Sequence, residues 1–434
     1  MEKLHNLKEH ICSFDNLFEA YRSAAKGKED RPETVRFAAR LEENLMALKR
    51  DLENQTYRVG KYREFYVRYP KKRLVMAISF RDRVAQWAVY RQIDPYIDKR
   101  YIEDSYGCRR DKGPIRAAEK LLHWIREVGR KPDAGDWWMI KGDISKYFYR
   151  VDHEIALDCY REICDEEWFL WLMDEIINNR DVPFGLPEGM TINDCPREKR
   201  LFEVGQPIGN LTSQETANLY LNRFDQYVKH GLKIHRYIRY MDDFTAIVRG
   251  RKAAEETLAA MGKFLESELR LKLSPKCRTI RADHPTEFVG YMVGRSGIRL
   301  RKKTRAHMKR SILHITEAYR KGEIELDDAI VRIECYRGMT KPCRGGTMRR
   351  WMEEHVVLTR ERVFYRIIKN KDDGTVDVWL TPGTAVPIYD SLTGRYDYNF
   401  RILAVRGLIP WDGMEEDIRN RYTDWVASAE EIEI

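Results

Sequence analysis

The spacing of apolar residues predicts a helical N-terminal region, followed by helices and strands in mixed order. Apolar side chains recur every three or four residues over 14–21 and 37–48, which predicts helices within residues 1–56, interrupted at Gly27 and Pro32. Residues 62–79 alternate basic and apolar side chains, which is typical of two strands joined by the Pro70-Lys71-Lys72 turn. Further helices are predicted over 81–99, 113–127, 153–163, 166–179, 213–230, 253–269, 304–319 and 326–336.

Two apolar segments end on acidic residues. The run Trp137 to Gly142 is followed by Asp143, which predicts a buried strand with a carboxylate at its tip. Two apolar runs within 234–248 bracket Asp242 and Asp243, which predicts a hairpin with acids at its turn. Other predicted elements are a Pro- and Gly-rich loop over 181–207, strands over 287–293 and 297–300, short β-type runs after Val363, and an amphipathic helix over 415–427.

Charge divides the chain unevenly. The 434 residues carry a formal net charge of +9, but the segment from Phe364 onward holds 8 basic and 13 acidic residues. The tail is therefore at −5 and the preceding 363 residues are at +14. This distribution indicates a polyanionic partner for the first five-sixths of the chain and a separate role for the tail.

Composition excludes several classes of protein. A hydrophobic content of 43% and 24 tyrosines exclude a wholly disordered or collagen-like chain. No run of about 18 apolar residues predicts a membrane span, and the charged N-terminus does not resemble a signal peptide, so a cytoplasmic location is expected. Eight scattered cysteines without a CxxC pair predict reduced thiols, and the histidines show no metal-ligand spacing such as HExxH.

The acids at the predicted strand ends are candidate metal ligands. Asp143 and Asp242 are 99 residues apart, so only the fold can bring them together. Carboxylates at strand tips suit Mg²⁺, which prefers oxygen ligands and keeps coordination positions for substrate phosphates. The alternative is that Asp143 caps the next helix and that Asp242 and Asp243 form a polar turn.

The residues around these acids resemble a known family. Tyr240-Met241-Asp242-Asp243 matches the YxDD box of reverse transcriptases, and the segment Asp143 to Phe148 resembles their first palm motif. Between them, Gly209-Asn210-Leu211-Thr212-Ser213 resembles the Gly-x-x-x-Ser motif that lies beneath the incoming nucleotide. Three motifs in the expected order carry the resemblance.

The resemblance extends over roughly residues 1–350. Residues 80–84 and 106–109 resemble finger motifs, residues 271–276 resemble the palm motif with a lysine, and residues 288–291 resemble the primer grip. It implies an α+β right-hand polymerase with an antiparallel palm sheet. The implied domains are an N-terminal helical segment (1–60), fingers (61–130), palm (131–295, with a fingers-side insertion at about 160–205), a helical thumb (296–360) and an acidic β-rich appended domain of unknown role (361–434).

One departure from the common motif indicates a subtype. Most of the superfamily has Gln-Gly-x-x-x-Ser-Pro, whereas this chain has Ile208 before Gly209 and Gln214 after Ser213. This double substitution resembles reverse transcriptases of diversity-generating retroelements, which copy a template-repeat RNA with errors at adenines. The alternatives are drift in a retron-like or antiphage-defence reverse transcriptase, and a catalytically idle RNA-binding scaffold, which the intact acids argue against.

A physical reason links position 208 to copying fidelity. A side-chain amide there would hydrogen-bond or orient the incoming nucleotide, whereas isoleucine offers only shape and branched bulk. Loss of a polar positioning contact should loosen geometric selection. The preference for errors at adenine comes only from the resemblance.

The resemblance also implies roles at the active site. Asp143, Asp242 and the backbone carbonyl of Ile144 would hold two Mg²⁺ ions, with Mn²⁺ as a substitute, and Asp243 is the less directly ligating acid. Phe148 would exclude a ribose 2′-hydroxyl, the alternative being a core aromatic. The remaining expected nucleotide contacts are Ile208, Gly209, Ser213 and Gln214.

Cationic residues are assigned to phosphates. Lys72, Arg73 and Arg81 are candidates for contact with the triphosphate, the alternative being a solvated or template-binding face. Lys276 would protonate the pyrophosphate leaving group, the alternative being a surface lysine. A basic helix over 299–310 would lie on nucleic-acid backbone, the alternative being an exposed charged helix. Its cations are Lys302, Lys303, Arg305 and Lys309.

The resemblance implies nucleic-acid partners. The primer grip would comprise Phe288, Val289, Gly290 and Tyr291. Expected partners are an RNA template, a DNA or RNA primer, the cDNA, dNTPs and an accessory variability determinant protein that is a basic oligomer. No ribonuclease H-like acid cluster is visible, so template removal is expected to fall to other enzymes.

Overall fold

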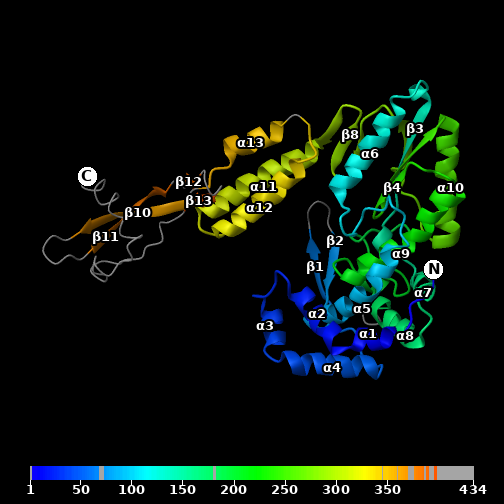
Figure 1. The fold of residues 1–434 in the computed structure, drawn as a ribbon, viewed down its shortest axis with the longest axis horizontal. Coiled ribbons are helices and arrows are strands. Elements are labelled where there is room, and N and C mark those ends of the chain that lie inside the picture. The colour runs from blue at the N-terminus through cyan, green and yellow to red at the C-terminus, as the bar shows by residue number, and fades with distance from the viewer. Residues whose placement is uncertain are drawn as a thin grey trace. The chain divides into compact units, whose positions relative to one another are not determined.

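The computed structural model describes residues 2–67, 73–178, 182–344 and 346–358, together with the backbone of four strands between residues 360 and 397. The chain divides into two compact units, Met1–Ile298 and Arg299–Ile434. Each unit is described by itself below, and their elements are labelled in Figure 1.

The first unit begins with helices that surround one long helix. They are α1 (Leu7–Cys12), α2 (Phe14–Ala25), α3 (Pro32–Ala38), α4 (Leu41–Glu53) and the long α5 (Phe80–Asp98). The apolar face of α2 packs on α5. The expected helix over 37–48 is wrong as one element, because Arg40 leaves helical geometry (φ −134°, ψ 50°) and separates α3 from α4.

The strand pair expected over 62–79 is confirmed. Strands β1 (Arg63–Val67) and β2 (Arg73–Ala77) are antiparallel, with Phe65 opposite Val75. Leu74 and Met76 of β2 are buried in a small core with Phe184 and Leu186 from the 181–207 loop. The turn expected at residues 70–72 lies outside the described residues.

The central sheet carries the predicted acids. Its strand order is β4 (Tyr237–Tyr240), β5 (Asp243–Arg249), β3 (Trp137–Asp143) and β6 (Arg278–Arg281), and every pairing is antiparallel. The buried strand ending at Asp143 and the hairpin bracketing the two acids are therefore confirmed. The sequence pattern did not predict β6.

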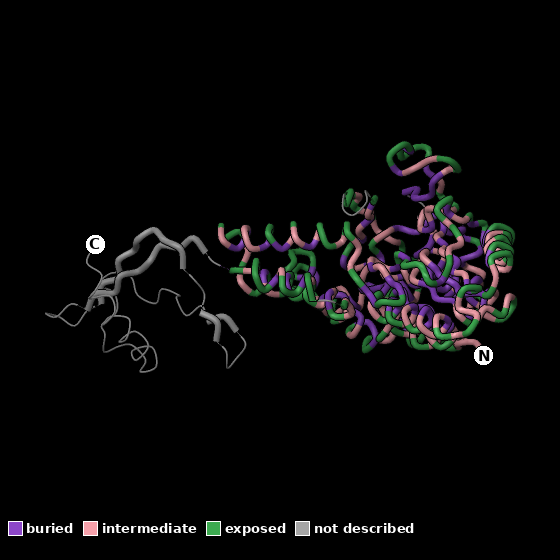
Figure 2. Tube along the Cα trace, turned by 90° about the horizontal axis from the view of Figure 1, so that it is seen from above, coloured by how far each residue is buried: buried purple, intermediate pink, exposed green. Residues whose placement is uncertain are grey.

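Helices pack against this sheet and against one another. They are α6 (Pro114–Val128), α7 (His153–Arg161), α8 (Glu167–Ile177), α9 (Leu211–Gln226) and α10 (Arg251–Leu269). Helix α9 continues as a π-helical turn at Tyr227–Gly231. Short 3₁₀ turns lie at Ala134–Asp136, Tyr147–Tyr149 and Arg197–Lys199. Helix α10 covers β3 and β5, and α9 packs on α5, α7 and α10 (Figure 1). Most residues of α9 are buried, and the buried segments of this unit are purple in Figure 2.

The single strand expected over 287–293 is wrong. Residues Thr286–Phe288 form β7 and Tyr291–Gly294 form β8, and a tight turn joins them. Both turn residues have positive φ, 44° at Val289 and 91° at Gly290, as a two-residue hairpin turn of matching twist requires. The sequence pattern did not predict this turn, because the turn lies within an apolar run and because valine, a β-branched residue, rarely adopts positive φ. Strand β9 (Gly297–Leu300) completes the three-stranded sheet.

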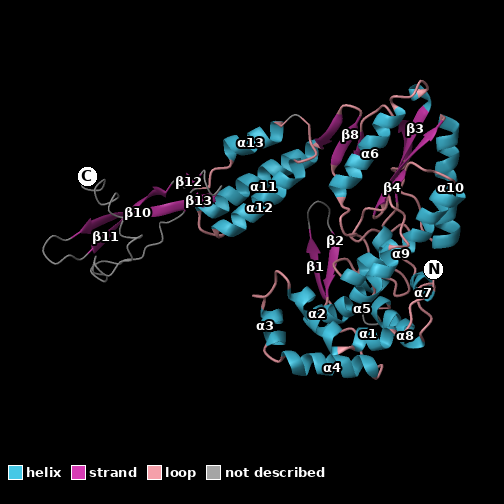
Figure 3. Cartoon of the chain, viewed as in Figure 1, coloured by secondary structure: helices cyan, strands magenta, loops and turns pink. Residues whose placement is uncertain are grey.

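The second unit contains a helical core. Helices α11 (Lys302–Arg320), α12 (Leu326–Thr340) and α13 (Thr347–His355) pack around Met308, Ile312, Ile333 and Met352 (Figure 3). The expected basic helix over 299–310 starts too early, because Arg299 and Leu300 belong to β9. Helix α13 was not predicted, and the helix expected over 415–427 lies outside the described residues.

The described strands beyond this core form two hairpins. Strand β10 (Arg360–Lys369) pairs with β11 (Val376–Ala385), and β12 (Ile388–Asp390) pairs with β13 (Arg395–Asp397). The β-type runs expected after Val363 are thus found as strands. The domain names and boundaries given from the resemblance stay predictions.

We expect Gly142→Ala to destabilise the central sheet. Gly142 lies opposite Phe244, and a Cβ at this position would be 2.0 Å from the Phe244 ring. Displacing a buried ring should lower the free energy of unfolding by about 1–3 kcal/mol. Urea denaturation measures the change. In the control Gly135→Ala the nearest atom, Nη2 of Arg281, is 3.8 Å away, so a loss of equal size there would contradict the steric explanation.

Candidate active site

The fold brings the three predicted acids to one end of the central sheet. Asp143 ends β3 and is directly opposite Asp243, the first residue of β5. Asp242 occupies the turn between β4 and β5. The antiparallel pairing of β3 with β5 therefore brings together the two motifs, which are far apart in the sequence.

The carboxylates of Asp143 and Asp242 repel each other. Burial raises the pKa of Asp242 to about 6, and the neighbouring Asp143 carboxylate is the next cause. A cationic side chain, Arg73 of β2, acts weakly in the opposite direction. Within the described residues, neither Asp143 nor Asp242 forms an ion pair, so their negative charge is available to a cation from outside the chain.

Asp243 is in a different situation. Its carboxylate forms an ion pair with Nζ of Lys141 and accepts a hydrogen bond from the backbone N–H of Val289. Burial raises the pKa of Asp243, and the Lys141 ammonium counteracts that rise. The protein itself therefore compensates part of the charge of Asp243, and its assignment as the less directly ligating acid stays a prediction.

The backbone at Ile144 presents an unused acceptor. Ile144 and Leu273 form an antiparallel bridge whose flanking bonds are Ser145 N–H to Lys272 O (2.9 Å) and Ser274 N–H to Asp143 O (2.8 Å). In such a pair the hydrogen-bonding groups of Ile144 itself point away from Leu273. Its N–H donates to the Asp242 carbonyl at 3.1 Å, and in the described part of the chain no backbone donor reaches its own carbonyl.

These groups fit Mg²⁺. Two carboxylates without a protein cation and one backbone carbonyl are hard oxygen ligands. The described residues contain no cluster of three or more His, Cys, Asp or Glu side chains suited to a metal, so the fit rests on Asp143, Asp242 and the Ile144 carbonyl.

The predicted nucleotide motif lies between β2 and α9. The Ile208 carbonyl accepts a hydrogen bond from Met76 N–H at 3.2 Å, and the Ile208 side chain packs on the small core behind β2. Gly209 has φ +116°, and a Cβ there would be 3.0 Å from Val75. Ser213 is buried in the first turn of α9, and Gln214 Oε1 accepts a hydrogen bond from Cys108 at 3.3 Å.

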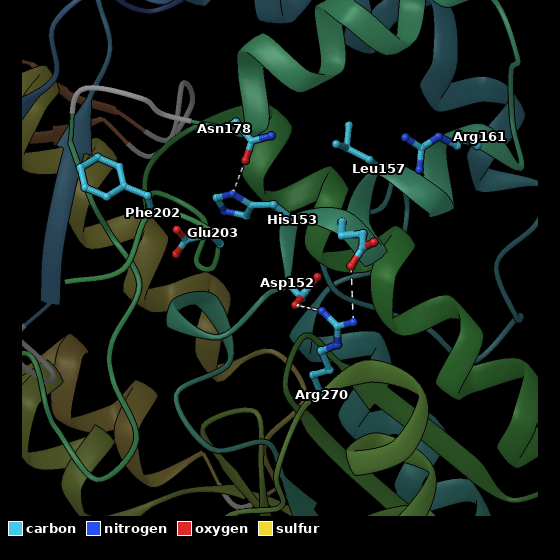
Figure 4. Close-up of a pocket in the computed structure, with 9 residues that line it drawn as sticks. Asp152, His153, Leu157, Arg161, Asn178, Phe202, Glu203 and Arg270 are labelled. Atoms are coloured by element: carbon cyan, nitrogen blue, oxygen red, sulfur yellow. Dashed lines mark hydrogen bonds and ion pairs between the residues drawn. The ribbon is translucent and has the colours of Figure 1, made fainter.

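A separate pocket of about 600 Å³ contains none of the predicted site residues. Figure 4 shows Arg270 reaching Asp152, and His153 directed at Asn178. Arg270 also forms an ion pair with Glu154 at 3.4 Å. His153 is also hydrogen-bonded to the Gly205 carbonyl at 2.7 Å, so it anchors the 181–207 loop.

Comparison with known proteins decides the family. The profile described as "Reverse transcriptase (RNA-dependent DNA polymerase)" matches residues 68–293, just over half of the chain. The chain belongs to the reverse transcriptase family. Its enzymatic class is that of an RNA-directed DNA polymerase, and its α+β fold, with an antiparallel sheet carrying the acids, is that of a right-hand polymerase.

Individual relatives differ in how much they share with this reverse transcriptase. It is 26% identical over 272 residues to Protein YkfC of Escherichia coli K12, covering 54% of this chain and 67% of YkfC. It is 24% and 29% identical to the mitochondrial nuclear intron maturases 1 and 2 of Arabidopsis thaliana over 102 and 119 residues. Each match covers 24% of this chain, but only 13% and 15% of the two maturases.

Among solved structures, a truncated apo telomerase from Candida tropicalis aligns with a TM-score of 0.40 and 12% identity, covering 56% of this chain and 55% of that one.

The helices that the structure describes include none with the length and apolar character needed to span a membrane.

The fingers residues of this reverse transcriptase lie in contrasting environments. Arg73 is exposed at the start of β2, within electrostatic reach of Asp242. Arg81 is ion-paired with Asp51 at 2.6 Å and stacks on Tyr57, so its charge is already engaged. Lys72 lies outside the described residues. The triphosphate contacts therefore stay predictions, and Arg73 has the most suitable location.

The other predicted residues of the first unit lie in the segment after β3, in the loop before β6, and on the β7–β8 hairpin. Phe148 is half-buried against Tyr147, and Lys276 is exposed in the loop that holds the Asp143 carbonyl through Ser274. Phe288 and Tyr291 are buried at the base of the β7–β8 turn formed by Val289 and Gly290. The Val289 N–H of the predicted primer grip interacts with the Asp243 carboxylate.

The predicted backbone-binding cations lie on α11 in the second unit. Lys302, Lys303 and Arg305 are exposed, whereas the Nζ of Lys309 lies 4.5 Å from the centre of the Trp351 ring of α13. Among the residues that the structure describes, Lys302, Lys303 and Arg305 have no ring contact of this kind, and their role in nucleic-acid binding stays a prediction.

Two charged residues of the site escaped the sequence interpretation. Lys141 interrupts the apolar run that ends at Asp143, and Arg239 interrupts the run before the YxDD box. A charge inside a run predicted to be buried is the signal that should have singled them out, because such charges are rarely buried without a partner.

We expect Asp242→Asn to stabilise the metal-free protein at neutral pH. The folded-state pKa of about 6 lies above the usual value near 4, so ionised Asp242 destabilises the fold above pH 6. Removing its charge should raise the free energy of unfolding at pH 7.5 by on the order of 1–2 kcal/mol, after allowance for solvent screening. The gain should shrink as pH falls from 6 towards 4, where the wild-type carboxyl takes up a proton.

Urea denaturation with a chelator present, between pH 5 and 8, measures this difference. Asp243→Asn is the matched comparison, because Lys141 counteracts the rise in the pKa of Asp243, so its gain should be smaller than that of Asp242→Asn. Equal stabilisation by both variants, or a gain independent of pH, would contradict the assigned repulsion.

Proposed function

We propose that this reverse transcriptase makes error-prone, adenine-mutagenic cDNA from a template-repeat RNA, for targeted diversification of a variable gene. The observation that supports this subtype is the pair Ile208 and Gln214 in the nucleotide motif. The intact Asp143, Asp242 and Asp243 support catalysis rather than RNA binding alone.

In the proposed reaction, Asp143, Asp242 and the Ile144 carbonyl hold two Mg²⁺ ions, with Mn²⁺ as a possible substitute. When bound, the ions supply charge stabilisation for the attacking and leaving oxygens of phosphoryl transfer. Arg73 offsets charge on the triphosphate from the fingers side. Lys276 delivers a proton to the departing pyrophosphate, and Phe148 selects against a ribose 2′-hydroxyl.

The position of Ile208 supports a role in fidelity. Its carbonyl is tied to Met76 of β2, and its side chain packs on an apolar core rather than on polar groups. The strand that holds it also begins with Arg73, the candidate triphosphate contact. A change of side chain at 208 should therefore alter the fit of the nucleotide and not the fold of the palm.

A retron-like or antiphage-defence reverse transcriptase is the second candidate. The similarity to YkfC and to intron maturases favours general reverse transcription and carries no mark of the mutagenic subtype. A neighbouring pair of repeats that differ only at template adenines would support the first candidate. A structured noncoding RNA without such repeats would support the second.

The proposed partners are an RNA template, a DNA or RNA primer, the growing cDNA, dNTPs and an accessory variability determinant protein. The exposed cations Lys302, Lys303 and Arg305 are suited to phosphate contact. Such binding weakens as the salt concentration rises, because the release of counterions from the nucleic acid then contributes less free energy. The accessory protein is proposed from the family resemblance.

Asp242→Ala should abolish dNTP incorporation on a primed RNA template. The variant loses one of two carboxylates that form no ion pair among the described residues, so the ions would lose a ligand. Primer extension with Mg²⁺ measures the activity, and the loss should be about 1,000-fold or more, in line with electrostatic stabilisation at active sites. Asp30→Ala, at an exposed position of the N-terminal region, is the control. Retained activity in Asp242→Ala would eliminate the proposed site.

Ile208→Gln should lower the error frequency at template adenines. The amide restores a polar group that can orient the incoming nucleotide, and a discrimination gain of about 1–2 kcal/mol corresponds to roughly 5- to 30-fold fewer errors. Sequencing of cDNA made on an RNA template with all four bases measures errors per base. Wild-type copying that is equally faithful at adenine and the other bases would favour the second candidate.

A further inference from the structure

Arg239 is a fully buried cation next to the catalytic turn. Its side chain has no exposed surface, and neither has that of its ion-pair partner Asp225 on α9. Burying such a pair is costly unless its geometry is very good and the remaining hydrogen-bonding groups are satisfied. The buried Arg239–Asp225 pair is therefore expected to do more than fill the core.

All five N–H groups of the Arg239 guanidinium have acceptors. Two bind Asp225 in a fork, with Nε to Oδ1 at 2.8 Å and Nη2 to Oδ2 at 2.6 Å. The second N–H of Nη2 donates to Ser105 Oγ at 3.2 Å. The two N–H groups of Nη1 donate to Asn218 Oδ1 and to the Met241 carbonyl, both at 3.1 Å.

These acceptors come from three separate segments. Asn218 and Asp225 lie on α9, the helix that begins with the nucleotide motif. Ser105 lies in the segment after α5, which also pairs with the Arg239 backbone through Asp104 O and Tyr106 N–H. Met241 is the turn residue immediately before Asp242. Arg239 therefore connects α9 and the fingers-side segment to the catalytic turn.

The turn itself has an unfavourable backbone conformation. Met241 has φ 54°, a left-handed value that costs energy for a residue other than glycine. On the far side, Gly107 packs so closely that a Cβ there would lie 2.8 Å from Met241 N. The Asp242 carbonyl is held by the Ile144 N–H. Arg239 supplies the remaining bond, to the carbonyl of Met241.

We propose that Arg239 is a positioning residue that fixes the location of the Asp242 carboxylate relative to the nucleotide motif on α9. The inference rests on the proposed polymerase function and adds a residue that touches neither substrate nor metal. A guanidinium is required because only its planar fork bonds Asp225, Asn218 and the Met241 carbonyl at once.

The test is pre-steady-state incorporation of one dNTP by the full chain on an RNA template with an annealed primer. Arg239→Lys keeps a cation beside Asp225 but cannot maintain all five bonds. The burst rate should fall roughly 10- to 100-fold, because small misplacements of catalytic groups have effects of this size. The burst amplitude per folded enzyme and the affinity for primer–template should stay unchanged.

A purely structural role would give the opposite pattern. Loss of folded protein lowers the burst amplitude and the unfolding temperature but leaves the burst rate of the remaining enzyme intact, and this result would overturn the inference. Arg236→Lys is the matched control, because Arg236 binds Glu127 through Nε at 3.1 Å and has no bond to the turn. Its burst rate should equal that of the wild type.

A second variant keeps the inference testable if Arg239→Lys does not fold. The double substitution Arg239→Met with Asp225→Asn removes both charges, and the amide oxygen at 225 still accepts the hydrogen bond from Tyr237 Oη. It should show the same reduced burst rate, and a wild-type rate would refute the positioning role. Absence of any dNTP incorporation by the wild type would instead refute the polymerase function itself.

Discussion

The repulsion between the Asp143 and Asp242 carboxylates is the constraint around which this reverse transcriptase is organised. Burial and the neighbouring Asp143 carboxylate both disfavour the ionised form of Asp242, as the raised pKa of Asp242 shows. Two nearby cations are engaged elsewhere, because Lys141 is paired with Asp243 and Arg239 with Asp225, and Arg73 relieves the repulsion only weakly. Uncompensated negative charge at this end of the sheet suits the proposed binding of divalent cations.

The surroundings hold the repelling groups in place through the backbone. Gly142 gives the Phe244 ring room beside the strand end, and Gly107 allows the chain to approach Met241 closely. Bonds from Ser274 and Ile144 fix the carbonyls of Asp143 and Asp242. The buried carboxylates thus destabilise the fold, and the close packing and backbone hydrogen bonds around them stabilise it, a distribution common to active sites.

Net charge by itself overstates how many cations are free to bind nucleic acid. The segment before Phe364 carries +14, yet Arg81 is paired with Asp51 and Lys309 lies over Trp351. Exposed and unpaired cations are the ones suited to phosphate contact, since an engaged guanidinium must first break its own ion pair. Arg73, Lys302 and Lys303 remain the better candidates on this basis.

The sequence by itself determined the family, the order of most helices and strands, and the location of the acids at strand ends, because these depend on local periodicity and on contiguous motifs. It missed the break at Val289 and Gly290 inside an apolar run, and it assigned no role to Lys141 or Arg239. Only the tertiary structure decided that Lys141 neutralises Asp243 and that Arg239 pairs with Asp225 of α9. Those pairings join residues from different elements, and the physical reason is that a buried charge selects its partner in space and not along the chain.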